Sequence, residues 1–284
     1  MRLVTFESKN AEPRPGVMTG EGIVDLCELN PSLPRGIREI LAANALGRVA
    51  ELASGPSAAR AENIRLLSPI PQPSKVIGVG LNYRNHAIES GMAIPAEPIV
   101  FTKFATSVIG PEMPIRLPEI SEEVDFEAEL AVVIGRRGRN VAQGDAMNYV
   151  AGYTLANDVS ARDWQLKKPG GQWILGKTFD TFCPLGPALV TSDEVPDPHN
   201  LRIQLRLNGE TMQDSTTSEL IFRVDQLIAY LSQIFTLEPG DVILTGTPPG
   251  VGFARKPPVF LRPGDVCEVE IEGLGILRNM CLRD

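Results

Sequence analysis

Residues 125–135, with the sequence DFEAELAVVIG, alternate acidic and apolar side chains and then become almost wholly apolar. Because side chains along a strand point to opposite faces in turn, Glu127 and Glu129 share one face of a predicted strand, and the other face is apolar. The acidic face continues into Ala131 and Val133, which indicates that it runs toward the protein interior. Two neighbouring carboxylates there would repel each other and be poorly solvated, so the pattern predicts a bound cation. A solvated face of a half-buried strand is the alternative interpretation.

The composition argues against several classes of protein. The chain has 284 residues, 43% of them hydrophobic, and a formal charge of -8, which argues against a nucleic-acid partner. It contains no run of 18 or more apolar residues and no apolar core of a secretory signal near its start, so we expect a soluble protein without a membrane partner. The four cysteines are widely separated and form no C-x-x-C motif. This favours reduced thiols and a cytoplasmic location over a zinc site or a disulfide framework.

The sequence predicts two domains. Residues 1–70 contain a first strand, a hairpin near residues 19–21 and a helical pattern over residues 37–52, which together predict a small N-terminal α/β domain. A Pro-rich linker at residues 68–74 leads into a second domain, residues 71–284. There, many strands without regular alternation with helices predict a β-rich α+β fold with a curled mixed sheet. The clearest strands are expected at residues 75–83, 98–104, 129–135, 149–158, 201–209, 241–246 and 265–273, and helices at residues 85–91 and 224–235.

A third carboxylate comes from Asp158, at the end of the apolar segment 149–157. With Glu127 and Glu129 it would form an all-oxygen site, which suits Mg²⁺, with Mn²⁺ or Ca²⁺ as alternatives. Zinc would more often recruit His or Cys. A helix-capping or turn role is the alternative interpretation of Asp158.

The segment GLNYRNHAIESG, residues 80–91, offers a candidate general base. If it is helical, His86 and Glu89 lie on one face, and a paired carboxylate raises the basicity of an imidazole and fixes its tautomer. A chance ion pair on a surface helix is the alternative. The other histidine, His199, is expected in an exposed loop without a role.

Two further features are weaker signals when each is taken alone. Lys177 lies in a Phe-rich and Pro-rich segment, where a lysine can place a positive charge against a substrate anion. A solvated lysine is the ordinary alternative. The Gly-rich and Pro-rich segment TGTPPGVG, residues 245–252, offers backbone N–H groups that can hold a carboxylate, and it lacks the lysine of a phosphate-binding loop.

The order of these motifs resembles that of the fumarylacetoacetate hydrolase family. The resemblance covers roughly residues 70–284 and rests on six segments in sequence order: GLNYRNHAIESG, FTKFATSVIGP, DFEAELAVVIG, ANDVSARDWQ, GKTFDTFCPLGP and LTGTPPGVG. It implies a mixed β-sandwich roll, a homodimer and a divalent metal held by Glu127, Glu129 and Asp158. The founding hydrolase has a further aspartate ligand before its histidine, but residues 80–82 of this chain contain none.

The resemblance also implies roles in catalysis and substrate binding. His86 and Glu89 resemble the water-activating pair, and Lys177 the cationic stabiliser. Three further residues resemble substrate contacts, namely Arg162, Gln165 and Thr247. The predicted reaction is Mg²⁺-dependent hydrolysis of a C–C bond in an acylpyruvate-type 2,4-dioxo acid, through a pyruvate enolate.

Two other functions are compatible with the same residues. Decarboxylation of oxaloacetate or isomerisation of a related dienoic acid would pass through the same enolate without an attacking water. A catalytically silent metal-binding protein is the third reading. The role of Asp125 is not predicted.

Overall fold

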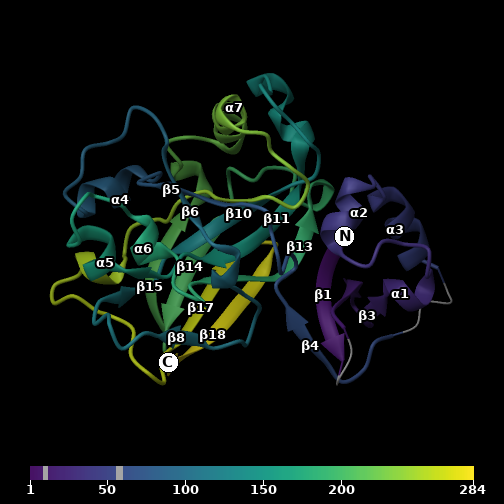
Figure 1. The fold of residues 1–284 in the computed structure, drawn as a ribbon, viewed down its shortest axis with the longest axis horizontal. Helices are drawn as coiled ribbons and strands as arrows, with labels where there is room; N and C mark the ends of the chain where they lie inside the picture. The colour runs from purple at the N-terminus through teal and green to yellow at the C-terminus, as the bar shows by residue number, and fades with distance from the viewer. Residues whose placement is uncertain (9–11, 56–59) are drawn as a thin grey trace.

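The structure is a computed structural model that describes residues 1–8, 12–55 and 60–284. Strands form most of its regular structure, which confirms the β-rich α+β class (Figure 1). The strands of the first half are β1 (Arg2–Ser8), β2 (Arg14–Thr19), β3 (Gly22–Asp25), β4 (Ile64–Leu67), β5 (Val76–Gly80), β6 (Ile99–Lys103), β7 (Val108–Ile109), β8 (Ile115–Leu117), β9 (Val124–Asp125) and β10 (Ala128–Ile134). Those of the second half are β11 (Val150–Asn157), β12 (Ser160–Ala161), β13 (Cys183–Thr191), β14 (Arg202–Leu207), β15 (Glu210–Thr216), β16 (Val242–Leu244), β17 (Val266–Ile271) and β18 (Gly275–Arg283). The α-helices are α1 (Leu26–Leu29), α2 (Ile37–Ala42), α3 (Leu46–Ala53), α4 (Arg84–Glu89), α5 (Arg162–Leu166), α6 (Ile174–Lys177) and α7 (Val224–Ile234).

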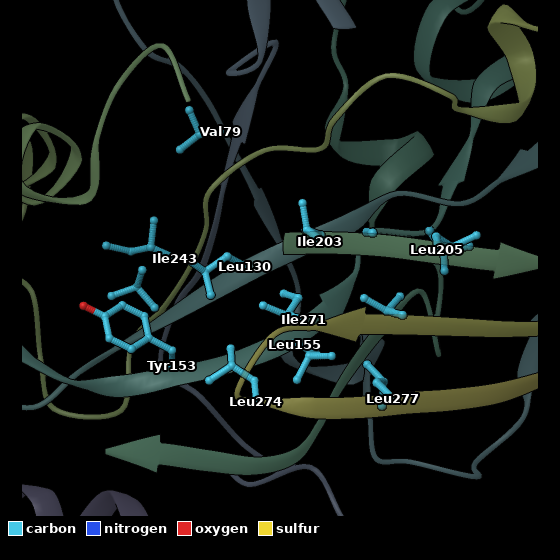
Figure 2. Close-up of a cluster of buried hydrophobic side chains, with 14 of the residues drawn as sticks. Val79, Leu130, Tyr153, Leu155, Ile203, Leu205, Ile243, Ile271, Leu274 and Leu277 are labelled. Atoms are coloured by element: carbon cyan, nitrogen blue, oxygen red, sulfur yellow. The ribbon is translucent and has the colours of Figure 1, made fainter. Parts of the chain in front are cut away.

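Two large sheets pack against each other. The main sheet has the strand order β3-β2-β1-β13-β11-β10-β16-β5-β6, with β4 and β7 attached to β1 and β13, and the second has the order β15-β14-β17-β18-β8. Both sheets mix antiparallel and parallel pairs. Strands β14, β17 and β18 of the second sheet contact β10 and β11 of the main one (Figure 1). Figure 2 shows the apolar layer between them, with Leu130 and Leu155 facing Ile203 and Ile271.

Strand β10 is buried on both faces, as the alternation in DFEAELAVVIG predicts. Leu130, Val132 and Ile134 point into the core between the two sheets. Ala131 and Val133 point the other way and pack in a second core with helices of the N-terminal segment. The face that carries the glutamates therefore runs into the protein interior.

The N-terminal segment continues the main sheet. Strand β1 pairs with β13, and the hairpin β2–β3 turns where it is predicted, with Thr19 opposite Gly22. The predicted division after residue 70 stays a proposal. The single helix predicted over residues 37–52 is wrong in one respect, since the chain breaks into α2 and α3. Asn44 adopts a positive φ of 53° between them, a left-handed conformation that ends a helix.

The structure corrects one further detail. Strand β13 is not predicted, because Pro184 and Pro187 lie inside it and proline normally marks a strand edge. Gly240 and Gly264, which follow Pro239 and Pro263, have the positive φ that a type II turn requires.

Within the described part of the chain, the structure contains no helix long and apolar enough to cross a bilayer. The four cysteines all lie in described segments, and each is a free thiol.

Candidate active site

Pairing between β10 and β11 brings the three predicted metal ligands together. Ala128 lies opposite Asn157, so Glu127 and Asp158 are neighbours at the same end of the two strands. The Asp158 N–H donates to the Glu127 carbonyl at 2.8 Å, and the Asn157 side chain accepts from the Glu127 N–H at 3.0 Å. One carboxylate oxygen from each of Glu127, Glu129 and Asp158 lies within 4.8 Å of the others, and all three residues are buried.

Buried cations surround this carboxylate trio. Lys177, the last residue of α6, donates to Glu127 Oε2 at 2.7 Å and to Asp158 Oδ2 at 2.8 Å. Arg162, the first residue of α5, pairs with Glu127 Oε1 at 2.6 Å through Nη2. Such charges are stable in the interior only when they are paired, so the carboxylates and the two cations stabilise each other.

The pKa values of Glu127 and Glu129 shift in opposite directions. Burial raises the pKa of Glu129 well above its usual range, and the charges of Asp158 and Glu127 raise it further. Burial acts on Glu127 in the same direction, but Lys177 and Arg162 outweigh it and hold its pKa below the usual range. Burial would lower the pKa of Lys177, but Asp158 and Glu127 outweigh that effect and raise it, so the lysine is cationic. A divalent cation would relieve the repulsion on Glu129.

Lys103 is a site residue that the sequence reasoning misses. Its fully buried ammonium donates to Asp158 Oδ1 and, at 3.1 Å, to the Val159 carbonyl. The only local feature in the sequence is that this lysine lies near the end of the mostly apolar segment 98–104. Nothing in the sequence distinguishes this lysine from one that reaches solvent at the strand end.

Asp125 is fully buried and holds Arg162 in place. It accepts from Arg162 Nε at 2.9 Å and from the backbone N–H groups of Gly252 and Phe253 at 2.7 and 3.0 Å. The Arg162 guanidinium also lies over the Phe253 ring, 4.5 Å from its centroid. Asp125 therefore orients the arginine and is not one of the trio.

The loop at residues 245–252 binds carboxylates of the protein itself. The Gly246 N–H donates to Glu129 Oε2 at 2.6 Å, and the Gly250 N–H donates to both oxygens of Glu89 at 2.9 and 3.0 Å. Gly246 has a φ of 102°, and a Cβ there would lie 2.7 Å from Asn82 Cβ. Only glycine fits this position, which explains why the loop is rich in this residue.

His86 and Glu89 form the predicted pair. Helix α4 places them three residues apart, and His86 Nδ1 lies 2.8 Å from Glu89 Oε1. His86 is buried and lines a cavity together with Glu127, Glu129 and Lys177. His86 therefore lines the cavity that contains the carboxylates, and its contact with Glu89 is not a surface ion pair.

The three predicted substrate contacts line the same cavity. Arg162, Gln165 and Thr247 are all buried. Gln165 accepts from Arg162 Nη1 at 2.8 Å, one turn along α5. Thr247 accepts from Gln213 Nε2 at 2.8 Å, and Gln213 is a support that the sequence reasoning does not single out. Apolar side chains complete the wall, chiefly Phe101, Trp173, Phe253 and Leu166.

His199 lies outside this cavity and is buried, so the expectation of an exposed loop is wrong. Its Nε2 accepts from the Val224 N–H at 3.1 Å, and its Nδ1 contacts Arg223 Nη2 at 2.9 Å. The ring therefore satisfies a backbone N–H at the start of α7, which a sequence pattern does not reveal.

This fold and this cavity define a class of β-rich enzymes whose site combines a carboxylate trio, buried cations and a histidine–glutamate pair. Residues 75–281 match the family model described as fumarylacetoacetate (FAA) hydrolase C-terminal. The chain belongs to the fumarylacetoacetate hydrolase family, which confirms the predicted fold.

Relatives and a solved structure agree with this assignment. The chain is 54% identical over 285 residues to the mitochondrial oxaloacetate tautomerase fahd2 of Xenopus laevis, with 98% of this chain and 89% of the relative covered. It is 51% identical over 286 residues to the mitochondrial oxaloacetate tautomerase FAHD2A of Homo sapiens, with 98% and 91% covered. The fumarylacetoacetate hydrolase of Exiguobacterium antarcticum superposes with a TM-score of 0.86 at 35% identity, over 100% of both chains.

The names of both relatives place them in mitochondria. This finding overturns the expectation of a cytoplasmic location. Free cysteines do not distinguish one reducing compartment from another.

Proposed function

We propose that this protein is an oxaloacetate tautomerase, which moves a proton between C3 and the 2-oxygen of oxaloacetate. The observation that carries the proposal is the His86–Glu89 pair in the same buried cavity as the carboxylate trio and Lys177. A proton-transfer group and a cationic site for an enolate are the two parts that this reaction requires. The names of the two relatives support the choice of substrate.

The donor set fits a hard divalent cation. Glu127, Glu129 and Asp158 offer only oxygens, and the raised pKa of Glu129 reflects burial and repulsion that a cation would relieve. We propose Mg²⁺, which when bound would polarise the 2-oxo group and offset the charge of the enolate.

His86 moves the proton in this scheme. Glu89 accepts from Nδ1–H, which leaves Nε2 free to act as the base. His86 removes a proton from C3 of the keto form, and the electron pair of the C–H bond leaves an enolate with its charge on the 2-oxygen. The protonated His86 then gives its proton to that oxygen, which forms the enol and restores the base, and the reverse transfers convert the enol into the keto form. Proton transfer by a positioned side chain contributes about 10²- to 10⁴-fold to a rate.

The cationic side of the cavity suits a dicarboxylate. Arg162 is fixed by Asp125 and Gln165, so its guanidinium is preorganised for a substrate carboxylate. Lys177 lies beside the trio, where it would stabilise the enolate oxygen. Thr247 lines the same cavity and offers a hydroxyl to the substrate.

Hydrolysis of an acylpyruvate is the second candidate, because of the apolar wall formed by Phe101, Trp173 and Phe253. Such a wall suits an acyl group better than it suits a second carboxylate. In that reaction His86 would take a proton from water, which attacks the C4 carbonyl, and cleavage of the C–C bond would release a carboxylic acid and a pyruvate enolate. Decarboxylation of oxaloacetate would share the same enolate and needs no water.

A direct rate comparison tests the proposal. Purified protein with Mg²⁺ is mixed with enol oxaloacetate, and the loss of enol absorbance is corrected for the spontaneous reaction. We expect His86→Ala to lower the enzymatic rate by about 10²- to 10⁴-fold. His199→Gln is the matched control, because it alters the only other histidine, which lies outside the cavity, and should keep the rate.

Near-normal tautomerisation by His86→Ala would refute the mechanism. The same preparation is also tested for release of pyruvate from acetylpyruvate and from oxaloacetate. Rapid cleavage of acetylpyruvate without tautomerisation above the spontaneous rate would favour the second candidate. Release of pyruvate from oxaloacetate alone would identify a decarboxylase.

A further inference from the structure

Lys103 is a buried lysine that the reaction above does not use. It ends strand β6, its side chain is 0% exposed, and its ammonium bonds to Asp158 Oδ1 and to the Val159 carbonyl. Burying a lysine is strongly unfavourable unless its charge is paired, so this position carries a specific interaction. The partner is one of the three carboxylates of the cation site.

Each carboxylate of the trio has one oxygen paired with a protein group other than Lys177. Glu127 Oε1 is held by Arg162 at 2.6 Å, and Glu129 Oε2 by the Gly246 N–H at 2.6 Å. Asp158 Oδ1 is held by Lys103. The second oxygens of Glu127 and Asp158 both bond to the Lys177 ammonium, so they point toward one shared position.

This arrangement limits each carboxylate to one oxygen for a bound cation. Mg²⁺ requires a small octahedral shell and accepts single carboxylate oxygens together with water or substrate. Ca²⁺ takes six to eight oxygens and often binds both oxygens of a carboxylate. A site in which one oxygen of every ligand is held by Arg162, the Gly246 N–H or Lys103 therefore favours the smaller ion.

We propose that Lys103 is a positioning residue that holds Asp158 as a one-oxygen ligand and thereby makes the site prefer Mg²⁺ over Ca²⁺. The inference rests on the cation site of the proposed function, but it concerns the choice of ion and not the reaction. Lys103 is suited to this task because its ammonium is anchored at two points, the carboxylate and the Val159 carbonyl. The Gly246 N–H and Arg162 perform the same task for the other two carboxylates.

The test compares the dissociation constants for Mg²⁺ and Ca²⁺, measured by calorimetry without substrate. Lys103→Met removes the donor and frees Asp158 Oδ1. We expect the affinity for Mg²⁺ to fall by about 10- to 100-fold, the usual effect of removing a group that orients a metal ligand, and the affinity for Ca²⁺ to fall less, so that the preference for Mg²⁺ decreases. The matched control is Lys75→Met, which breaks a lysine–aspartate pair away from the site, between Lys75 Nζ and the buried Asp241 at 2.7 Å. It should leave the preference unchanged.

The outcomes separate the inference from the proposed function. If Lys103→Met changes both affinities equally, Lys103 is only structural and the inference fails. If the wild-type protein binds neither ion, the cation site itself is refuted. A crystal structure of the wild-type protein with Mn²⁺ gives a test that does not depend on the folding of a variant. Asp158 should bind the ion through Oδ2 alone, and two-oxygen binding by Asp158 would overturn the inference.

Discussion

Three carboxylates of this protein are held by backbone N–H groups of a single loop. The loop at residues 245–252 binds Glu129, Glu89 and Asp125, which belong respectively to the carboxylate trio, the histidine–glutamate pair and the support of Arg162. A backbone N–H does not titrate and is fixed by the fold, so these contacts position the acids without adding charge. The loop thus connects the three parts of the site.

At the residue scale, His199 gives a prediction about pH. Burial and the nearby Arg223 lower the pKa of His199, while Asp197 and Asp225 oppose that shift. The unfolded chain has an ordinary histidine pKa of about 6.5 and binds a proton below it. The ring of the folded protein is still neutral just below that pH, because its pKa is lower. The contribution to stability is complete above the pKa of the unfolded chain and is lost as the pH falls through the lower pKa of the folded state.

We expect His199→Gln to reduce this pH dependence, because a glutamine oxygen can accept from the Val224 N–H without titrating. Urea unfolding between pH 7.5 and 5 should show a shallower loss of unfolding free energy in the variant. The difference in slope is at most about 1.4 kcal/mol per pH unit for one proton. Identical slopes for the two proteins would contradict this account.

At the element scale, helix α4 is attached to the rest of the protein at its two ends, with Asn82 just before it bonded to Phe222 and Thr245. Its C-terminal end is held by Glu89, which accepts from the Gly250 N–H, and Gly91 follows with a φ of 67°. At the other end, Leu81 has a φ of 54°, and Trp173 packs over Gly80. The helix carries His86 into the cavity, while Ile88 on the same helix is exposed. We propose that α4 closes over bound substrate.

Hydrogen exchange tests this closure. Oxalate, a planar dianion that resembles the pyruvate enolate, is added with Mg²⁺ to the wild-type protein. We expect the amides of α4 to exchange more slowly with oxalate than with Mg²⁺ alone, because closure protects their hydrogen bonds. Helix α7 serves as the internal control and should exchange at the same rate. Equal exchange of α4 in both states would contradict a closing motion.

At the scale of the whole molecule, the homodimer stays a prediction. Strand β18 exposes Ile276, Met280 and Leu282 on one face of the sheet, and this apolar stripe is interrupted by Arg278 between Ile276 and Met280. Exposed apolar stripes of this kind are typical of surfaces that bind another protein. The stripe is a candidate for the contact between two copies of the chain.

Light scattering tests the prediction. The wild-type protein should have twice the mass of one chain, and Met280→Glu should shift it toward the monomer, because a charge buried in an apolar contact is unfavourable. Met147→Glu, at a methionine that is also exposed, is the control and should remain dimeric. A wild-type monomer would refute the homodimer, and a fully dimeric Met280→Glu would place its contact elsewhere.

The sequence by itself determines those parts of the site that depend on local geometry. The two-residue period of a strand places Glu127 and Glu129 together, and the helical spacing pairs His86 with Glu89. The order of the motifs indicates the family and, through it, Asp158, Lys177 and the substrate contacts. It also indicates the β-rich fold, because strand patterns depend on residues close together in the chain.

The tertiary structure alone decides features that depend on distant partners. Lys103 and Asp158 are 55 residues apart, and only folding shows that the lysine is buried against that carboxylate. The burial of His199 likewise depends on α7, and the role of Asp125 depends on backbone groups 127 and 128 residues away. A charged side chain has the same local pattern whether it meets water or a buried partner. The desolvation that separates the two cases arises only when the chain is packed.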